Sequence, residues 1–420
     1  MQIYSPVFRY TKSHEIYNDL FIEAIMCTFA QEHHKRHTLS EFETHYIAIM
    51  AATRHRCTYI MEKHLEKFLH TGGDRTWLQG LQFAPLKYKL LDELNRALAH
   101  QPWHIGVMFI KELVNEGGNI TIEKWSIAEL TEAALILAQT HVMCSLVHAL
   151  GGIEIAREET DDEDDSDYEE EQQETKVVDE LNKENATDKC ENVVEELLRR
   201  MKNLDAASNQ AESDNFNNAL VDGTGNIGGN SPVRDPEEQT PVFSFNMHFG
   251  YVDFYSKSDK SVRTFRIVEY NWSDHGFNVI NDWCSDKLLV TNLDRKFSHT
   301  QSMTYKFMGK FEKVDTKKYR MAVWNYIQAL FGVRHDDYDY RQVNVLLDKE
   351  TKTFIKMMAC SPHKLDSDSL ASVMTGFKQS EKTHVLILVA EARLQAQLLY
   401  FSRAVYNYNL NRAHQRPPLD

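Results

Sequence analysis

The sequence predicts a mainly helical protein in two domains that flank a flexible acidic linker, and three observations support this prediction. Several long segments, the first of which is 13–35, contain no Gly or Pro and place apolar residues at helical spacing. Residues 157–240 are rich in Asp, Glu, Asn, Ser and Gly and poor in aromatic residues, so they cannot bury enough apolar surface to fold. The chain has 420 residues, of which 42% are hydrophobic, and this is enough for two folded domains at 1–156 and 241–420.

Charge is concentrated in the linker. The net charge is -15, and residues 158–174 contain twelve Asp or Glu and no Lys or Arg, which argues against nucleic acid as a main partner. No apolar run reaches the roughly 18 residues of a membrane span, and the amino-terminal stretch lacks the apolar segment of a signal peptide. The six cysteines are too scattered for a disulfide framework or a C-x-x-C zinc site. We therefore expect reduced thiols, no bound metal or cofactor, and a place in the cytoplasm or the nucleus.

Residues 45–64 are expected to form one amphipathic helix that presents a cysteine and a histidine on the same face. Cys57 and His64 would lie about 10 Å apart along the axis, so a water or a peroxide would have to bridge them. Tyr59 would lie about 200° around the helix from Cys57, and it needs a partner element to join the site. The basic residues 54–56 favour the thiolate form of Cys57. The alternative is an inert thiol packed in the core.

Residues 126–149 are expected to form a long apolar helix that begins at a Ser-x-x-Glu capping box. This helix should pack on the segment 45–64. His141, Cys144 and His148 share one face of it, but no carboxylate or second thiol accompanies them in the sequence. We therefore expect these side chains to pack in the core rather than to bind a metal.

Further helices are expected in the second half of the chain. A short one, about 190–204, lies inside the linker, where apolar residues recur at helical spacing. The second domain begins near 241 with aromatic, weakly alternating sequence that predicts extended or irregular structure. Helices should follow near 316–331 and 379–410. The last is apolar nearly all round in its middle, which predicts a central place in the core.

An acidic and aromatic loop, GVRHDDYDYRQVN at 332–344, lies between the last two of these helices. It places three aspartates beside tyrosine and histidine rings, which is more than solvation of a loop requires. Exposed acidic and aromatic groups of this kind suit the binding of a protein partner.

Segments from both halves of the chain resemble the sestrin family. In the first half they are HYIAIMAATRHRCTYI, TGGDRTWLQGL and LAHQPWHI. In the second half they are EYNWSDHGFNVIN, VWNYIQALFGV, the acidic loop and SEKTHVLILVAEARLQAQLLY. The resemblance covers 1–156 and 241–420 and leaves only the linker unmatched. It implies an all-α fold of two alkylhydroperoxidase-D-like helical domains.

The resemblance also implies a signalling function. Sestrins are stress- and nutrient-responsive inhibitors of target-of-rapamycin complex 1 signalling, and they act by binding the GATOR complex. In the family, the paired aspartates of the acidic loop serve this binding. For this chain the resemblance therefore implies that Asp336 and Asp337 contact the partner.

Some sestrins also bind free leucine in the second half. An acidic residue meets the ammonium group, an arginine meets the carboxylate, and threonines form a lid. The matching residues of this chain are Thr304, Tyr305, Thr316, Arg320 and Glu381. Three positions differ, because Phe307 replaces a lid threonine, Tyr319 a pocket leucine and Met374 a wall tryptophan. The two larger side chains predict that free leucine binds weakly or not at all.

The alternative function is that of a thiol-dependent alkyl hydroperoxide reductase in antioxidant defence. Alkylhydroperoxidase-D proteins use C-x-x-C followed by His, and this chain keeps the spacing of Cys57 and His64 but has Ile60 in place of the second cysteine. In sestrins the Cys, Tyr and His of this segment are described as a proton-relay set, which implies catalytic roles for Cys57, Tyr59 and His64. Without a resolving cysteine in the motif, each turnover would need an external thiol. A helical scaffold with vestigial sites is the third hypothesis.

Overall fold

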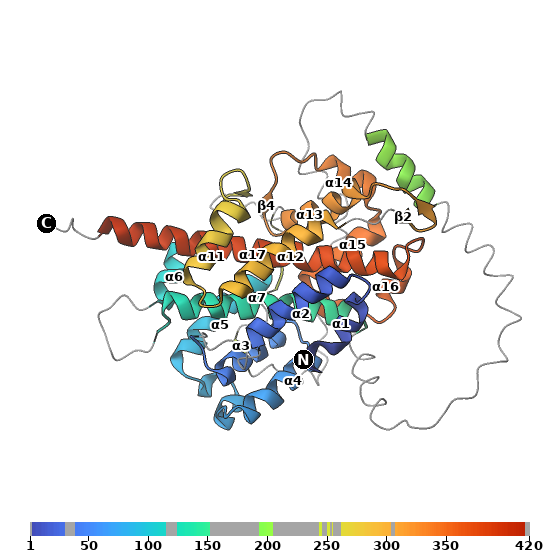
Figure 1. Cartoon of the computed structure of the whole chain (residues 1–420). Coiled ribbons are helices and arrows are strands. Elements are labelled where there is room, and N and C mark those ends of the chain that lie inside the picture. The colour runs from blue at the N-terminus through green and yellow to red at the C-terminus, as the bar shows by residue number, and fades with distance from the viewer. Residues whose placement is uncertain are drawn as a thin grey trace, which may run out of the picture.

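Two long apolar helices form the centre of the fold (Figure 1). In the computed structural model, α7 covers Ile127–Ala149 and α17 covers Gln379–Gln415, and the two helices pack against each other. Both are long and apolar enough to cross a membrane, but the most apolar stretch of each is entirely buried inside the protein, as in the core helix of a soluble protein. The prediction that the last helix is central to the core is confirmed.

The structure describes most of the chain outside the acidic linker. The described residues are 2–29, 38–114, 124–151, 193–204, 243–245, 250–252, 254, 262–303 and 307–415. The acidic tract and nearly all of the predicted linker lie outside them, so the prediction of a flexible linker stays a prediction.

The described residues of the first half are mainly helical. Its other α-helices are α1 Ser5–Thr11, α2 Glu15–Phe29, α3 Glu41–Arg54, α4 Thr58–His70, α5 Leu86–His100 and α6 Val107–Leu113. Short 3-10 helices lie between them at Gln2–Tyr4, Arg75–Gln79, Leu81–Phe83 and Pro102–His104. α7 begins at the predicted capping box, in which Ser126 and Glu129 bond to each other's backbone N–H groups.

The second half is also helical. Its other α-helices are α11 Asn278–Trp283, α12 Lys287–Ser302, α13 Lys317–Leu330, α14 Arg341–Leu346, α15 Lys349–Cys360 and α16 Ser369–Ser372. A π-helix at Trp272–Phe277 precedes α11, and a 3-10 helix at Pro362–Lys364 follows α15. Two small two-stranded ladders complete it: β1 Phe265–Arg266 pairs in parallel with β4 Val333–Arg334, and β2 Phe307–Met308 pairs antiparallel with β3 Phe311–Glu312. The all-α fold class is confirmed.

The segment 45–64 does not form one helix, so this prediction is wrong at its centre. The chain leaves helical geometry at residues 55–57, where Arg56 adopts a left-handed conformation with φ of 51°. His55 is fully buried there, and its Nε2 atom lies 3.0 Å from Nη2 of Arg393 on α17. This contact with a distant helix overrides the helix propensity of the local sequence.

A short helix at 193–204 is separated in the sequence from the other described helices, and it packs on the second half of the chain (Figure 1). Its apolar stripe faces inward, because Val194, Leu197 and Met201 are buried. The prediction of a helix at about 190–204 is confirmed for its described residues.

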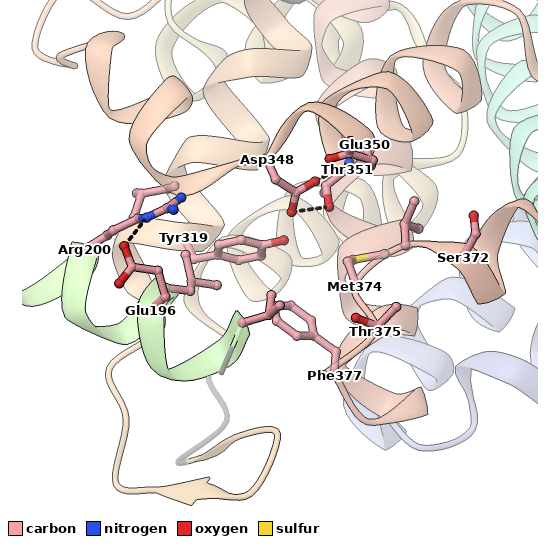
Figure 2. Close-up of a pocket in the computed structure, with 15 residues that line it drawn as sticks. Glu196, Arg200, Tyr319, Asp348, Glu350, Thr351, Ser372, Met374, Thr375 and Phe377 are labelled. Atoms are coloured by element: carbon pink, nitrogen blue, oxygen red, sulfur yellow. Dashed lines mark hydrogen bonds and ion pairs between the residues drawn. The ribbon is translucent and has the colours of Figure 1, made fainter. Parts of the chain in front are cut away.

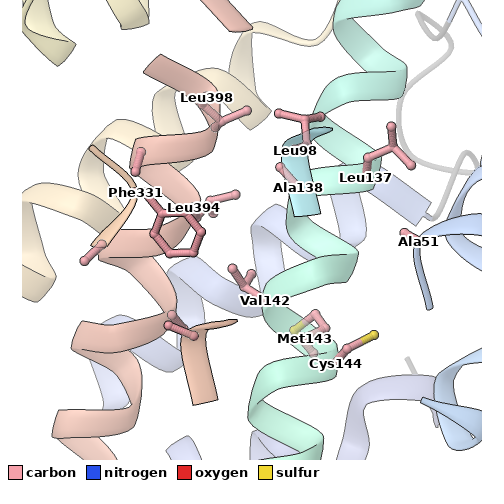
Figure 3. Close-up of a cluster of buried hydrophobic side chains, with 14 of the residues drawn as sticks. Ala51, Leu98, Leu137, Ala138, Val142, Met143, Cys144, Phe331, Leu394 and Leu398 are labelled. Carbon is pink, nitrogen blue, oxygen red and sulfur yellow. The ribbon is translucent and has the colours of Figure 1, made fainter. Parts of the chain in front are cut away.

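The two halves share one hydrophobic core. α2 packs against α12, and α7 packs against α17. Figure 3 shows side chains of both halves meeting there, among them Val142 of α7 and Leu394 and Leu398 of α17, all of them buried. The division into domains at 1–156 and 241–420 stays a prediction, because this common core does not establish that either half folds alone.

Candidate functional site

Cys57 occupies the N-cap position of α4 and is 2% exposed. The N-terminus of a helix carries partial positive charge and stabilises an anion such as a thiolate. The break between α3 and α4 therefore places this cysteine at a helix end, whereas the sequence had predicted a position on the face of one long helix.

A second thiol lies beside Cys57. Cys144, in the second half of α7, is fully buried, and its thiol lies next to that of Cys57. Burial raises the pKa of Cys144 well above its usual value, the neighbouring Cys57 raises it further, and Arg393 lowers it. This pairing could not be read from the sequence, because the two cysteines come from helices that lie far apart in the sequence.

His64 is fully buried, and both of its ring nitrogens have partners. Its Nε2 lies 2.6 Å from the hydroxyl oxygen of Tyr4, and its Nδ1 lies 2.9 Å from Nδ1 of His45. The other nitrogen of His45 lies 4.0 Å from the half-exposed carboxylate of Glu41. Burial lowers the pKa of His64 well below its usual value and that of His45 to about 4, so both rings are neutral at neutral pH. A chain of proton donors and acceptors therefore leads from Tyr4 through His64 to His45.

Tyr4 lies near the two thiols. Its pKa is raised well above the usual value, first by burial and then by the nearby Cys144, Cys57 and Tyr59. We call Tyr4, Cys57, Tyr59, His64 and Cys144 the thiol cluster. The structure thus brings the three predicted catalytic residues together with two that sequence reasoning missed. Tyr4 could not be identified as a site residue from the sequence, because it lies far before the segment that contains Cys57 and His64.

A buried cation lies beside the thiol cluster. The guanidinium of Arg393 is fully buried, and burial lowers its pKa to about 10, whereas Cys360 and Cys144 act in the opposite direction. Its partners are the carbonyl oxygens of Ala99 and His141, the hydroxyl of Ser145 and the ring of His55. Of the basic residues 54–56, expected to favour the thiolate, Arg54 instead donates to the hydroxyl of Ser244.

The histidines that share a helix face with Cys144 bond within the protein. His141 Nε2 lies 2.8 Å from the side-chain oxygen of Asn95, and His148 Nε2 lies 3.0 Å from the carbonyl oxygen of His55. Among the described residues, no group of three or more His, Cys, Asp or Glu side chains is arranged to hold a metal ion. These contacts support core packing for this face.

The residues expected to hold an amino acid's charged ends are already bonded within the protein. The carboxylate of Glu381 accepts hydrogen bonds from the backbone N–H of Gly309, at 2.9 and 3.0 Å, and from that of Lys378, at 2.7 Å. Nη1 of Arg320 donates to the carbonyl oxygen of Gln301 at 2.7 Å. A bound amino acid would have to displace these partners.

The cavity beside Arg320 and Glu381 has a volume of about 20 Å³, which is room for about one water molecule. Thr316 also lines it, and the rings of Tyr319 and Phe377 close it, with their centroids 5.5 Å apart. The predicted lid residues Thr304 and Tyr305 lie outside the described residues, and so does the side chain of Phe307.

A larger cavity lies next to this small one (Figure 2). Its volume is about 530 Å³, and the helix 193–204 forms one of its walls, with Tyr319 and Met374 on others. The sequence had assigned Tyr319 and Met374 to the same amino-acid pocket as Arg320 and Glu381. In the structure Met374 lines only the large cavity, and the two charged residues line only the small one.

Free leucine is therefore expected to leave the melting temperature of the protein nearly unchanged at millimolar concentration. A ligand at 100 times its dissociation constant would stabilise the fold by about 2.7 kcal/mol, which is a shift of several degrees. Thermal denaturation with and without leucine measures the difference. In the Tyr319→Leu variant the two cavities should merge and leucine should produce a larger shift. A shift of several degrees in the unaltered protein would contradict the prediction.

The acidic loop presents carboxylates from a rigid base. Tyr340, after the aspartates, is buried, and its hydroxyl accepts a hydrogen bond from the backbone N–H of His335 at 3.0 Å. Asp336 accepts a hydrogen bond from Nε of Arg266 at 2.9 Å, and Asp337 is exposed. The loop thus offers negative charge in a fixed position at the surface.

Comparison with known proteins finds one family over nearly the whole chain. The family model described as "PA26 p53-induced protein (sestrin)" matches residues 5–409. The sestrin homolog of Caenorhabditis elegans is 34% identical, over 90% of this chain and 88% of the relative. Sestrin-1 of Xenopus laevis is 36% identical, over 88% of this chain and 78% of the relative, and sestrin-2 of Homo sapiens is 35% identical, over 87% and 76%.

Proposed function

This chain belongs to the sestrin family, and we propose that it is a stress- and nutrient-responsive inhibitor of target-of-rapamycin complex 1 signalling that binds the GATOR complex. In this proposal it acts in the cytoplasm or the nucleus, with the second half as the partner-binding part. The cavity at Arg320 and Glu381 has a volume of only about 20 Å³. If an amino acid regulates the binding of the GATOR complex, it is therefore not leucine bound in this closed pocket.

The observation that supports this proposal best is the geometry of Asp336 and Asp337. Asp337 is exposed, the side chain of Asp336 is 27% exposed and pairs with Arg266, and the loop that carries them begins at the paired strands β1 and β4 and ends at the buried Tyr340. A partner therefore meets two carboxylates without first having to order the loop, and this lowers the entropic cost of binding.

Asp336→Ala with Asp337→Ala is expected to abolish capture of the GATOR complex in an affinity pull-down and to leave the fold intact. Exposed carboxylates seldom contribute more than about 0.5 kcal/mol to stability, so the melting temperature should change little. Asp368→Ala, which removes an exposed carboxylate from another loop, is the matched control and should bind normally. Full capture by the double variant would sink the proposal. Early melting would show that the aspartates are structural.

A thiol-dependent alkyl hydroperoxide reductase is the second candidate function. The thiol cluster favours it, because Cys57 sits at a helix N-terminus near Tyr4, and the Tyr4 hydroxyl contacts His64, which in turn contacts His45. The thiolate would attack the peroxide, and the tyrosine–histidine chain would deliver the proton that the leaving alkoxide needs. This activity would reside in the first half, away from Asp336 and Asp337.

Cys57→Ser is expected to remove all hydroperoxide reduction while leaving capture of the GATOR complex unchanged, because the sulfur is the nucleophile. Consumption of an alkyl hydroperoxide in the presence of an external thiol measures the activity. Tyr4→Phe, Tyr59→Phe and His64→Ala should each slow the reaction by about 10² to 10⁴ if they deliver protons. Cys284→Ser, which alters a buried thiol at the end of α11, should retain full activity. Activity retained by Cys57→Ser would rule out this function.

A further inference from the structure

The thiols of Cys57 and Cys144 are neighbours in the core. Cys57 is 2% exposed and Cys144 is fully buried, and the two side chains lie next to each other. Both are free thiols in this structure. Cys144 thus provides a second sulfur close to that of Cys57, in place of the second cysteine that the sequence motif lacks.

We propose that Cys144 is the resolving thiol of Cys57, so that reaction with a hydroperoxide ends in an intramolecular disulfide between the start of α4 and the middle of α7. This proposal rests on the second candidate function above, because it specifies how the oxidised Cys57 is resolved. The chemical class of the substrate is a hydroperoxide, and the class of the reductant is an external thiol.

The surroundings of the two sulfurs distinguish their roles. Cys57 lies at the N-cap of α4, in the turn that joins α3 to α4. Cys144 lies within the rigid α7, and burial keeps its pKa well above the usual value, so it remains a thiol during the first step. Arg393 acts in the opposite direction on Cys144 and can stabilise negative charge on its sulfur when it attacks in the second step.

The chemistry balances in two steps. In the first, the Cys57 thiolate attacks one peroxide oxygen, the O–O bond breaks, an S–O bond forms, and the alkoxide takes a proton to leave as an alcohol. The sulfur is thereby oxidised by two electrons. In the second, the Cys144 sulfur attacks the Cys57 sulfenic acid, the S–S bond forms, the S–O bond breaks, and the hydroxide leaves as water with the Cys144 proton. Two equivalents of external thiol then restore both cysteines by exchange.

The backbone allows the closer approach that a disulfide requires. Cys57 lies directly after Arg56, which has a φ of 51° in the short turn between α3 and α4. A turn adjusts more easily than the interior of a packed helix, so the movement is expected at Cys57 and not at Cys144. The established spacing of disulfide Cα atoms, about 4.4 to 6.8 Å, sets the target for that movement.

The experiment oxidises the reduced full-length protein with about one equivalent of cumene hydroperoxide, blocks the remaining thiols and maps the peptides without reduction. The unaltered protein should lose about two thiols per chain and yield a peptide in which Cys57 and Cys144 are linked. A sulfenic-acid probe added with the peroxide should label it weakly. Cys144→Ser should lose about one thiol, label strongly at Cys57, and proceed to sulfinic acid in excess peroxide. Cys27→Ser, a buried thiol elsewhere in the core, is the matched control and should behave like the unaltered protein.

Two results would overturn the proposal, and they differ in what else they exclude. If Cys57 of the unaltered protein is oxidised and labelled as strongly as in Cys144→Ser, with no linked peptide, Cys144 does not resolve it and the reductase function stands. If Cys57 resists oxidation in every variant, the reductase function fails as well. Because Ser at a fully buried position can disturb folding, Cys144→Ala is made in parallel and the melting temperature of each variant is compared with that of the unaltered protein.

Discussion

Replacing Lys296 by Met is expected to destabilise the fold by about 3 to 5 kcal/mol, because it leaves the buried carboxylate of Glu391 without its counter-charge. The Lys296 ammonium of α12 lies 2.9 Å from the carboxylate of Glu391 on α17, and the two side chains are 2% and 1% exposed. Tyr17 of α2 donates a hydrogen bond to the same carboxylate at 2.7 Å. One carboxylate therefore ties a helix of the first half to two helices of the second.

Urea denaturation of single and double variants tests this prediction. The double variant Lys296→Met with Glu391→Gln removes both charges. Its free energy of unfolding should be higher than the sum of the two single losses predicts, and it should recover most of the stability lost in Lys296→Met. Glu93→Gln is the matched control, because it breaks an ion pair whose carboxylate is 51% exposed, and it should cost less than about 1 kcal/mol. Strictly additive costs, or a cost for Lys296→Met as small as that of the control, would show that the buried pair carries little energy.

Mild acid is expected to unfold the protein between about pH 6.5 and pH 5. Burial lowers the pKa of His55, His64, His100 and His141 well below the usual value of 6.5. Above pH 6.5 these rings are neutral in both the folded and the unfolded chain, so they do not affect the free energy of unfolding. As the pH falls below 6.5 the unfolded chain binds protons that the folded chain cannot accept, and stability is lost until the folded pKa values are reached.

The size of this effect is comparable to the total stability of a typical domain. At pH 5.5 each buried neutral histidine costs about 1.4 kcal/mol, so the four together cost about 6 kcal/mol, against a usual free energy of unfolding of about 5 to 15 kcal/mol. Urea denaturation at closely spaced pH values gives the slope, which should reach at least about four protons taken up on unfolding, because other histidines with a lowered pKa, such as His45, add to these four. His100→Gln should lower that slope by about one proton, and the exposed His70→Asn should leave it unchanged. A stability that stays constant down to pH 5 would contradict the prediction.

His55 and the buried ion pair both lie at the contact between the two halves. Arg393 and Glu391 both lie on α17, and they reach into the first half at His55 and Tyr17 respectively. Lys296 of α12 neutralises Glu391, whereas Arg393 donates to neutral oxygens. Variants at these positions are therefore expected to loosen both halves at once, and not the second half alone.

The sequence by itself determined the features that depend on neighbours along the chain. The helix at Ile127–Ala149 begins at its Ser-x-x-Glu box, and the helix from Gln379 contains no Gly or Pro and is apolar on most sides, so both follow from local propensity and periodicity. The short helix at 193–204 followed from its apolar stripe in the same way. The family was also evident from contiguous segments, because they retain recognisable order over many residues.

Only the tertiary structure decided how chemically active side chains meet. The turn at residues 55–57 has no Gly or Pro to announce it, and it forms because His55 enters the core beside Arg393. Cys144 reaches Cys57, and Tyr4 reaches His64, across separations in sequence over which spacing carries no information. In the second half, the volumes of the cavities depend on how Tyr319 packs against Phe377. Local patterns specify which residues become helical, but the site depends on packing between helices, and that is a property of the whole folded chain.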